Sequence, residues 1–234
     1  KKPVFMKFAK FLRNLSSKPI KFSLPGPMTM VDTLYDNFYK SREKLAWRFA
    51  EVLNEEAKEL EKAGVDYIQF DEPAFNVFFD EVRDWGIETL ERAAKNLRSK
   101  TVVHICYGYG IKANNDWKKT LGSEWRQYEK IFPLLNKSKI DQISLECMNS
   151  KVPLDLLSLL KNKKILAGVI DVATNKVETP KKIFELIKKI THFVKPKQLS
   201  CCTNCGMITL PPKIAQRKME SMVQGAKIAE RYLF

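Results

Sequence analysis

Short apolar runs alternate with longer amphipathic segments along most of this chain. Runs bounded by turn residues predict strands at 20–24, 67–70, 101–107, 143–146, 164–171 and 199–205. Apolar residues spaced three and four apart predict helices at about 41–63, 79–96, 154–160, 180–193 and 212–233. Strands and helices that alternate at this spacing predict an α/β protein, with a parallel sheet and crossover helices.

The number of strand–helix units bears on the kind of α/β fold. About six units are visible, whereas a closed (β/α)8 TIM barrel needs eight. The chain also begins on a helix-like segment at 5–15, with no strand before it. We therefore expect a TIM barrel from which about the first two βα units are absent, either because the chain is a fragment or because its N-terminal part was not resolved. No repeat or linker divides residues 1–234, so we expect one catalytic barrel domain, incomplete at its N-terminus.

Some finer expectations follow from the same patterns. Gly64 is expected to stop the helix at 41–63. The segment Leu24-Pro-Gly-Pro-Met-Thr29 predicts a stiff turn, and the polar stretch 108–125 predicts a loop plus a helix over the barrel mouth. The expected inward positions of the first two long helices are Leu45, Phe49, Val52, Leu53, Ala57 and Leu60, and then Val82, Ile87, Leu90 and Ala94.

The charge of the chain is strongly positive. The formal net charge is +14, and lysines between 161 and 197 carry much of the excess. Such a run is typical either of a patch for an anionic partner, such as nucleic acid or an acidic protein, or of solvated outer helix faces. The run has no cluster of stacking aromatic residues and no recognisable nucleic-acid motif, so we favour solvated faces and expect no nucleic-acid partner.

The composition also bears on location. No apolar run approaches membrane-spanning length, and charge interrupts the short apolar patch at the N-terminus. We therefore expect neither a membrane segment nor a secretory signal. The five cysteines are an odd number and lack the dense spacing of a disulfide scaffold. They predict reduced thiols in a cytoplasmic protein.

Four potential ligands of a soft metal lie at predicted strand ends: His104, Cys106, Glu146 and Cys205. Residues i and i+2 of a strand point to one face, so His104 and Cys106 can share an ion. An imidazole, two thiolates and a carboxylate suit Zn²⁺. Taken singly, the histidine or a cysteine equally fits a buried core position. Their shared place at strand ends, where β/α barrels build active sites, favours a zinc site.

The remaining cysteines offer competing interpretations. Cys202 and Cys205 form a CxxC pair, which alone can mean a redox pair or half a zinc knuckle, but a knuckle needs a second such pair and the chain has none. Cys201 and Cys202 are expected to pack within their strand. Cys147 should point away from the face of Glu146 and be structural. His192 lies among lysines and is expected on the surface.

Asp71 and Glu72 close the strand at 67–70. Two adjacent carboxylates at a strand end can hold a substrate ammonium group or act as acid and base. The alternative is a carboxylate that caps the next helix. We favour a catalytic role for both residues, because they share the predicted rim with the metal candidates.

Six short motifs follow one another through nearly the whole chain: Leu24-Pro-Gly-Pro-Met-Thr29, Ile68-Gln-Phe-Asp-Glu-Pro-Ala74, His104-Ile-Cys-Tyr107, Ile143-Ser-Leu-Glu146, Gly168-Val-Ile-Asp171 and Asn204-Cys-Gly206. As an ordered set they resemble the C-terminal catalytic barrel of cobalamin-independent methionine synthase, and most closely its short single-barrel members. The resemblance implies a zinc ion held by His104, Cys106, Glu146 and Cys205. It also implies that Asp71 binds the amino group of homocysteine, with Glu146 and Asp171 also at the substrate.

The activity implied by the resemblance is that of a homocysteine S-methyltransferase, which forms methionine. A free alkyl thiol has a pKa of about 8.5, so little of it is thiolate at neutral pH. Zinc coordination deprotonates the thiol and keeps its sulfur nucleophilic. Glu146 is the hardest of the four ligands and is expected to yield when the substrate binds.

Three positions depart from the family pattern, and in the family all three contribute to folate binding or to release of the pterin. Thr33 stands where the family has a tryptophan that stacks on folate. Val77 replaces a carboxylate that helps to hold folate, and Ala173 replaces a histidine that protonates the leaving pterin. These departures favour a methylated corrinoid, either methylcobalamin or a corrinoid protein, over methyl-folate as the donor.

Other functions fit part of the pattern. The same barrel can transfer an alkyl group to another thiol such as coenzyme M, or perform chemistry like that of uroporphyrinogen decarboxylase. Asp71 favours an amino-acid thiol, because coenzyme M has no amine, and the decarboxylase needs no zinc. A third alternative is a basic binding protein that keeps the barrel without turnover.

Overall fold

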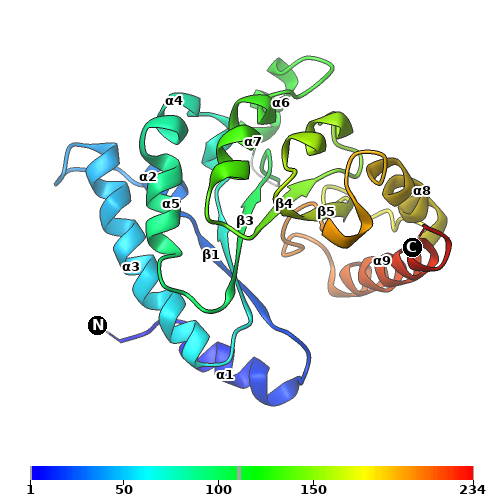
Figure 1. Ribbon diagram of the computed structural model, residues 1–234, viewed down its shortest axis with the longest axis horizontal. Helices are drawn as coiled ribbons and strands as arrows, with labels where there is room; N and C mark the ends of the chain where they lie inside the picture. The colour runs from blue at the N-terminus through cyan, green and yellow to red at the C-terminus, as the bar shows by residue number, and fades with distance from the viewer. Residues whose placement is uncertain (1, 110–111, 234) are drawn as a thin grey trace. The chain divides into compact units, whose positions relative to one another are not determined.

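The computed structural model describes residues 2–109 and 112–233 (Figure 1). Its strands form one sheet in the order β1-β2-β3-β4-β5-β6. The pairs β1–β2, β2–β3 and β5–β6 are parallel, which confirms the predicted parallel α/β sheet. The strands are β1 Lys21–Pro25, β2 Tyr67–Asp71, β3 Lys100–Ile105, β4 Gln142–Glu146, β5 Lys164–Ile170 and β6 Leu199–Thr203.

Helical segments connect consecutive strands. The α-helices are α1 Met6–Leu15, α2 Pro27–Asp32, α3 Arg42–Lys62, α4 Phe79–Glu81, α5 Ile87–Ala93, α6 Lys112–Thr120, α7 Tyr128–Lys137, α8 Pro180–Ile190 and α9 Pro212–Leu233. A π-helical turn, η2 Val82–Gly86, joins α4 to α5, and the 3-10 helices are η1 Pro73–Asn76, η3 Leu154–Leu159 and η4 Pro196–Gln198.

The chain divides into two compact units. The first comprises Lys1–Ile105 and Lys137–Gln142, and the second comprises Cys106–Asn136 and Ile143–Phe234. In the first unit α3 and α5 lie side by side (Figure 1). In the second, α8 packs against α9, where Gly225 lets the two helices approach so closely that an added Cβ would lie 2.6 Å from a methyl of Ile183.

Helix α3 forms where the pattern predicts it, but its buried face is rotated relative to the predicted inward positions. The hydroxyl of Ser41 accepts a hydrogen bond from the N–H of Lys44 and caps the helix, and Gly64, at φ +91°, follows its C-terminal end as predicted. The buried line runs through Ala46, Ala50, Leu53, Ala57 and Leu60, whereas Leu45, Phe49 and Val52 are only half-buried. Alanines on this face allow close approach of the neighbouring elements, so the larger side chains lie at its margin.

The single helix predicted at 79–96 is instead α4, a π turn and α5. Val82 and Leu90 are buried as predicted, but Ile87 and Ala94 are only half-buried. A π turn accommodates one extra residue, so it shifts the phase of the helical face that follows. Trp85, Thr89 and Ala93 are turned inward in place of the expected residues.

Some short elements also differ from the expectation. The stiff turn at 24–29 continues into α2, because Pro27 occupies the first helical turn. The segment at 154–160 is 3-10 rather than α-helical. Helix α7 was not predicted, since Pro133 interrupts its apolar spacing. Within the stretch 108–125, α6 is the expected helix, and residues 110–111 lie outside the described part of the chain.

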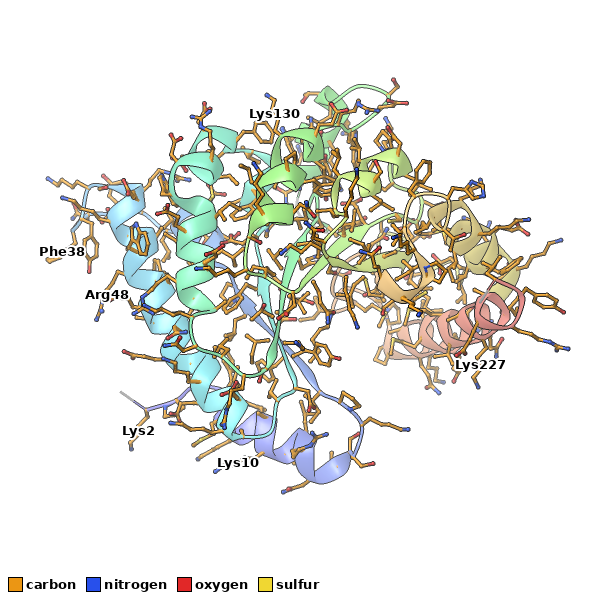
Figure 2. All side chains as sticks on the ribbon, in the orientation of Figure 1. Lys2, Lys10, Phe38, Arg48, Lys130 and Lys227 are labelled. Atoms are coloured by element: carbon orange, nitrogen blue, oxygen red, sulfur yellow. The ribbon has the colours of Figure 1, made fainter. Side chains whose placement is uncertain are left out.

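Many basic side chains extend from the helices into solvent. Figure 2 shows Lys10 and Arg48 of the first unit, and Lys130 and Lys227 of the second, directed away from the ribbon. Between residues 161 and 197 every lysine is exposed except Lys163. This distribution agrees with solvated helix faces. None of the described helices combines the length and the apolar character needed to cross a membrane.

Candidate metal site

Two thiols meet at the C-terminal side of the sheet strands. Cys106 directly follows β3, and Cys205 lies two residues beyond β6, whose last residue is Thr203. The hydroxyl of Thr203 donates to the carbonyl of Cys205 at 2.7 Å and shapes this turn. The sulfurs of Cys106 and Cys205 are 3.8 Å apart. Two sulfurs that each bind one tetrahedral zinc ion at about 2.3 Å lie about 3.8 Å from each other, so the pair fits that ion.

His104 is tied to this pair through the chain. It precedes Cys106 by two residues in the extended run that ends β3, and its side chain is buried. The ligand atoms of His104, Cys106 and Cys205 all lie within 4.8 Å of one another. An imidazole and two thiols in one small group are the soft ligand set that zinc selects. The group of His and Cys side chains can therefore hold a metal ion.

The surroundings of Cys106 disfavour its thiolate form. Hydrogen bonding to Cys205, burial and the nearby carboxylate of Glu146 raise the pKa of Cys106 well above its ordinary value. A divalent cation supplies positive charge and favours the deprotonated sulfurs, which agrees with the fit of the ligand set to zinc.

Glu146, at the end of β4, has both carboxylate oxygens bonded. The backbone N–H of Tyr107 donates to one oxygen at 2.8 Å, and the hydroxyl of Tyr109 donates to the other at 2.8 Å. Burial raises the pKa of Glu146, and these two hydrogen bonds oppose the rise. The carboxylate acts electrostatically on Cys106 but is not among the three residues whose ligand atoms lie within 4.8 Å of one another. Its roles as fourth ligand and at the substrate stay predictions.

Asn204 organises the turn before Cys205. Its side-chain oxygen accepts from the N–H groups of Cys147 and Met148, each at 3.2 Å, and its amide nitrogen donates to the carbonyl of Met148 and to the hydroxyl of Tyr109. Sequence reasoning missed both Tyr109 and Asn204 as site residues. Asn204 was visible within the Asn-Cys-Gly motif, whereas no pattern distinguished Tyr109.

In the first unit, Glu72 is fully buried and bonds the N-terminus of α2. Its carboxylate accepts from the N–H of Met28 at 3.0 Å, the N–H of Thr29 at 2.8 Å and the hydroxyl of Thr29 at 2.7 Å. Burial raises the pKa of Glu72 to about 7, against the effect of these bonds. A capping role therefore accounts for the contacts of Glu72, although the capped helix precedes the residue in sequence. A catalytic role stays a prediction.

Asp71 is only half-buried, in contrast to Glu72. It accepts a hydrogen bond from the side-chain amide of Gln69 at 2.7 Å. The β2–β3 register pairs Asp71 with His104, so the two residues end neighbouring strands. That position suits a carboxylate that receives an ammonium group, and the role stays a prediction.

Asp171, in the second unit, is buried within a network of polar contacts. Its carboxylate accepts from the side chain of Asn149 at 2.9 Å and from the N–H of Ala173 at 2.8 Å. Behind it, Glu178 accepts from the N–H of Asp171, and the ammonium group of Lys218 donates to the carbonyl of Asp171. The network fixes the position of Asp171, whose substrate role stays a prediction.

The other thiols and the second histidine lie where they were expected. Cys147 is buried and burial raises its pKa, while Cys201 and Cys202 are half-buried within β6. Burial also raises the pKa of Cys201 to about 11, so its thiol stays protonated at neutral pH. His192 is exposed.

The chain is similar in sequence to known proteins. The methionine synthase of Saccharolobus islandicus is 35% identical over 217 residues, which cover 92% of this chain and 59% of that protein. The methionine synthase of Sulfurisphaera tokodaii is 33% identical over 233 residues, which cover 99% of this chain and 63% of that protein. This chain thus spans about three fifths of the length of these relatives.

Solved structures agree with the sequence relatives. A B12-independent methionine synthase from a Shewanella species, solved in complex with selenomethionine, superposes with a TM-score of 0.96 at 61% identity and matches 100% of this chain and 68% of that one. A Listeria monocytogenes protein, 18% identical with a TM-score of 0.69, shares the fold; 100% of this chain and 71% of that one are matched. The expected fold class, of the methionine synthase barrel type, is confirmed by these likenesses.

The family model described as "Cobalamin-independent synthase, Catalytic domain" matches residues 1–228. That match covers all the strands and each residue of the candidate metal site. The family resemblance noted in the motifs is confirmed, and the chain belongs to the cobalamin-independent methionine synthase catalytic-domain family.

Proposed function

We propose that this chain carries the zinc site of a methyltransferase that methylates the thiol of homocysteine and forms methionine. The observation that carries the proposal is the group of His104, Cys106 and Cys205, whose sulfurs lie at the separation that one tetrahedral zinc ion requires. The names of the relatives support the same chemistry. Because this chain spans only part of those relatives, the activity of the whole protein is included in the proposal.

Each residue of the site has a definite part in this proposal. His104, Cys106 and Cys205 would hold the zinc ion, with Glu146 as a fourth ligand that yields to the substrate. A bound zinc ion lowers the pKa of a coordinated thiol and keeps the sulfur nucleophilic at neutral pH. Asp71, beside His104 in the strand register, receives the ammonium group of homocysteine and thereby directs its thiol. Asp171 completes the substrate contacts from its fixed position.

The reaction balances as a simple displacement. The thiol of homocysteine loses its proton to solvent, its sulfur forms a bond to the methyl carbon, and the bond from that carbon to the donor breaks. The donor leaves with the electron pair. The Shewanella relative was solved in complex with selenomethionine, which carries a methyl group on its selenium atom. Selenomethionine resembles methionine, the product of the proposed reaction, and so supports the proposal.

The proposed donor is a methylated corrinoid rather than methyl-folate. Thr33, Val77 and Ala173 stand at the positions where the resemblance implies contacts to folate, and none of the three carries a ring or a charge. Each of them is exposed. Activity with methylcobalamin and none with methyl-tetrahydrofolate is the expected result. The reverse result would overturn this part of the proposal and leave the zinc part intact.

Metal analysis with and without homocysteine tests the zinc part. We expect about one zinc per chain, held by two sulfurs, and one further sulfur neighbour at the zinc X-ray absorption edge when homocysteine is added. Methionine, which has no thiol, is the matched control and should add no sulfur. A protein without zinc, or zinc that does not respond to homocysteine, would contradict the proposal.

Two alternatives remain distinguishable. If the acceptor were a thiol such as coenzyme M, that thiol would add the further sulfur neighbour at the zinc absorption edge. Asp71 argues against this alternative, because coenzyme M has no amine for the carboxylate to bind. A basic binding protein predicts no metal and salt-sensitive binding to nucleic acid. A cytoplasmic location is part of our proposal, since the thiol ligands must stay reduced.

A further inference from the structure

We propose that Gln69 is a positioning residue, which aligns the carboxylate of Asp71 for a substrate ammonium group, and that Lys21 holds Gln69 in the orientation this requires. We call the hydrogen-bonded set of Lys21, Gln69 and Asp71 the amide relay. The inference rests on the proposed function, because it takes Asp71 as the residue that receives the ammonium group of homocysteine.

The first observation is that the three residues lie on one face of the sheet. Gln69 and Asp71 are two residues apart on β2, so their side chains point to the same side. The β1–β2 register pairs Lys21 with Tyr67, which lies two residues before Gln69 on that same side. The relay therefore runs diagonally from β1 to the C-terminal end of β2, where the β2–β3 register pairs Asp71 with His104.

The second observation fixes the direction of the amide. The ammonium group of Lys21 donates to the side-chain oxygen of Gln69 at 2.6 Å. An ammonium group has donors and no acceptor, so it can bond only the oxygen end of the amide. The nitrogen end of Gln69 then faces Asp71 and donates to one carboxylate oxygen at 2.7 Å. A rotated amide would place its oxygen against the negative carboxylate.

The third observation is the burial of Gln69. The residue is 7% exposed and stands between Ile68 and Phe70, which are fully buried on the opposite face of β2. A buried amide costs free energy unless its polar ends are bonded. Lys21 and Asp71 bond the two ends, so loss of either bond leaves a buried polar group with fewer partners. The orientation of Gln69 is therefore coupled to both neighbours.

The chemical consequence concerns the charge that Asp71 offers to a substrate. An ammonium group bonded directly to Asp71 would compete with the substrate ammonium group for the same carboxylate. The amide of Gln69 stands between Lys21 and Asp71 and presents a neutral N–H instead. That N–H fixes one oxygen of Asp71 without cancelling the charge of the carboxylate. A carboxylate that is both aligned and negative suits an ammonium group, because a charge-assisted hydrogen bond depends on geometry and on charge.

Binding of two thiols that differ only in the amine tests the relay. The probes are homocysteine and γ-mercaptobutyrate, which has the same carbon chain and carboxylate but no amino group. In Gln69→Met we expect the dissociation constant for homocysteine on the zinc-loaded protein, measured by calorimetry, to rise about tenfold, because Asp71 loses the hydrogen bond that aligns it. The constant for γ-mercaptobutyrate should change by less than about twofold, since this thiol has no ammonium group for Asp71 to bind.

Two control variants separate positioning from a structural effect. Gln142→Met removes a glutamine of the same 7% exposure at the start of β4, and both dissociation constants should stay within about twofold of those of the unaltered chain. Lys21→Arg keeps a charged group that only donates, so homocysteine affinity should be retained. A structural effect of Gln69→Met would instead weaken the binding of both thiols together.

The part of Lys21 is tested by a double-mutant cycle. Lys21→Met removes the donor that orients the amide, and we expect the dissociation constant for homocysteine to rise about threefold. In Lys21→Met/Gln69→Met the rise should be no larger than in Gln69→Met alone, because Lys21 acts through Gln69. Losses that simply add would overturn the place of Lys21 in the relay.

The outcomes separate the relay from the proposed function. If the unaltered chain prefers homocysteine, and Gln69→Met keeps that preference or loses affinity for both thiols alike, the relay is overturned while the proposed function stands. If the unaltered chain binds both thiols equally, the ammonium role of Asp71 fails and the relay fails with it. If the unaltered chain binds neither thiol, the proposed function as a whole is overturned together with the relay.

Discussion

At the scale of single residues, the environment of each side chain assigns different tasks to chemically similar groups. Glu72 and Glu146 are both buried carboxylates at strand ends, yet Glu72 is bonded by the first turn of α2 and Glu146 by a phenol and a backbone N–H beside the thiols. Cys147 and Cys205 differ likewise, because Cys147 packs in the core and Cys205 faces another sulfur. The chemistry follows from the neighbours rather than from the residue type.

Replacement of Cys205 by serine is expected to remove the metal while the fold persists. A serine hydroxyl is a far weaker ligand than a thiolate, and only two of the three ligand side chains would remain. We expect less than a tenth of the zinc per chain, measured by elemental analysis, with an unchanged circular dichroism spectrum. Cys201→Ala, on β6 but outside the ligand group, serves as the control. Full zinc content in Cys205→Ser would contradict the ligand assignment.

Replacement of Glu72 by glutamine tests its capping task. The amide cannot accept all the bonds that Met28 and Thr29 donate, so an unfavourable contact replaces one of them. We expect a loss of about 1–3 kcal/mol in the free energy of unfolding, measured by urea denaturation. The exposed Glu43→Gln should change stability by less than about 0.5 kcal/mol. Unchanged stability together with lost activity would instead favour the predicted catalytic role.

At the scale of elements, α9 contacts the loop that carries Asp171 through the buried Lys218. Lys218 is fully buried and donates to the carboxylate of Glu178 and to the carbonyls of Asp171 and Lys176. The hydroxyl of Ser221, one turn later on α9, donates to the carbonyl of Glu178. The closing helix therefore fixes the loop that carries Asp171, in addition to covering α8.

Loss of this ion pair should be costly. Lys218→Met leaves the buried carboxylate of Glu178 without its counter-charge, and we expect a loss of about 3–5 kcal/mol in the free energy of unfolding. The double variant Lys218→Met/Glu178→Leu should recover most of that loss, because no uncompensated charge remains. Lys213→Met, on the exposed start of α9, is the control. A single variant as stable as the unaltered chain would show that the pair contributes little.

At the scale of the whole molecule, metal binding and folding are linked. Cys106 and Cys205 are separated by 99 residues in sequence, so an ion held by both closes a long loop of the chain. A ligand that binds only the folded chain stabilises it by about 2.7 kcal/mol at a concentration one hundred times its dissociation constant. The site is therefore expected to contribute to stability as well as to chemistry.

Zinc removal is expected to lower the melting temperature. At about 2–4 °C per kcal/mol for a chain of this size, saturating zinc should raise the midpoint by roughly 5–10 °C over the chelated protein. Differential scanning calorimetry with and without a chelator measures the shift. Cys205→Ser should show no such dependence. If the melting temperature of the unaltered chain were the same with and without zinc, that result would argue against a metal held by the folded state.

Much of the architecture could be predicted from local patterns. The positions of the strands and of α3, α8 and α9 follow from apolar periodicity. The end of α3 before Gly64 follows from the freedom of glycine at positive φ. His104, Cys106 and Cys205 could be selected as candidates because each lies at the C-terminal end of a predicted strand, and their role as metal ligands stays a prediction. The strands and helices depend on residues that are close in sequence, which is why the sequence by itself determined them.

The tertiary structure alone decided the features that join distant residues. The hydroxyl of Tyr109 meets a carboxylate 37 residues away and an amide 95 residues away, and Glu72 bonds a helix 43 residues before it. The rotated face of α3 and the π turn before α5 likewise depend on what packs against each helix. Periodicity reports which face of an element is apolar, but the partner of a buried polar group is set by where the chain returns in space, so the roles of Glu72, Tyr109 and Asn204 emerged only from the folded chain.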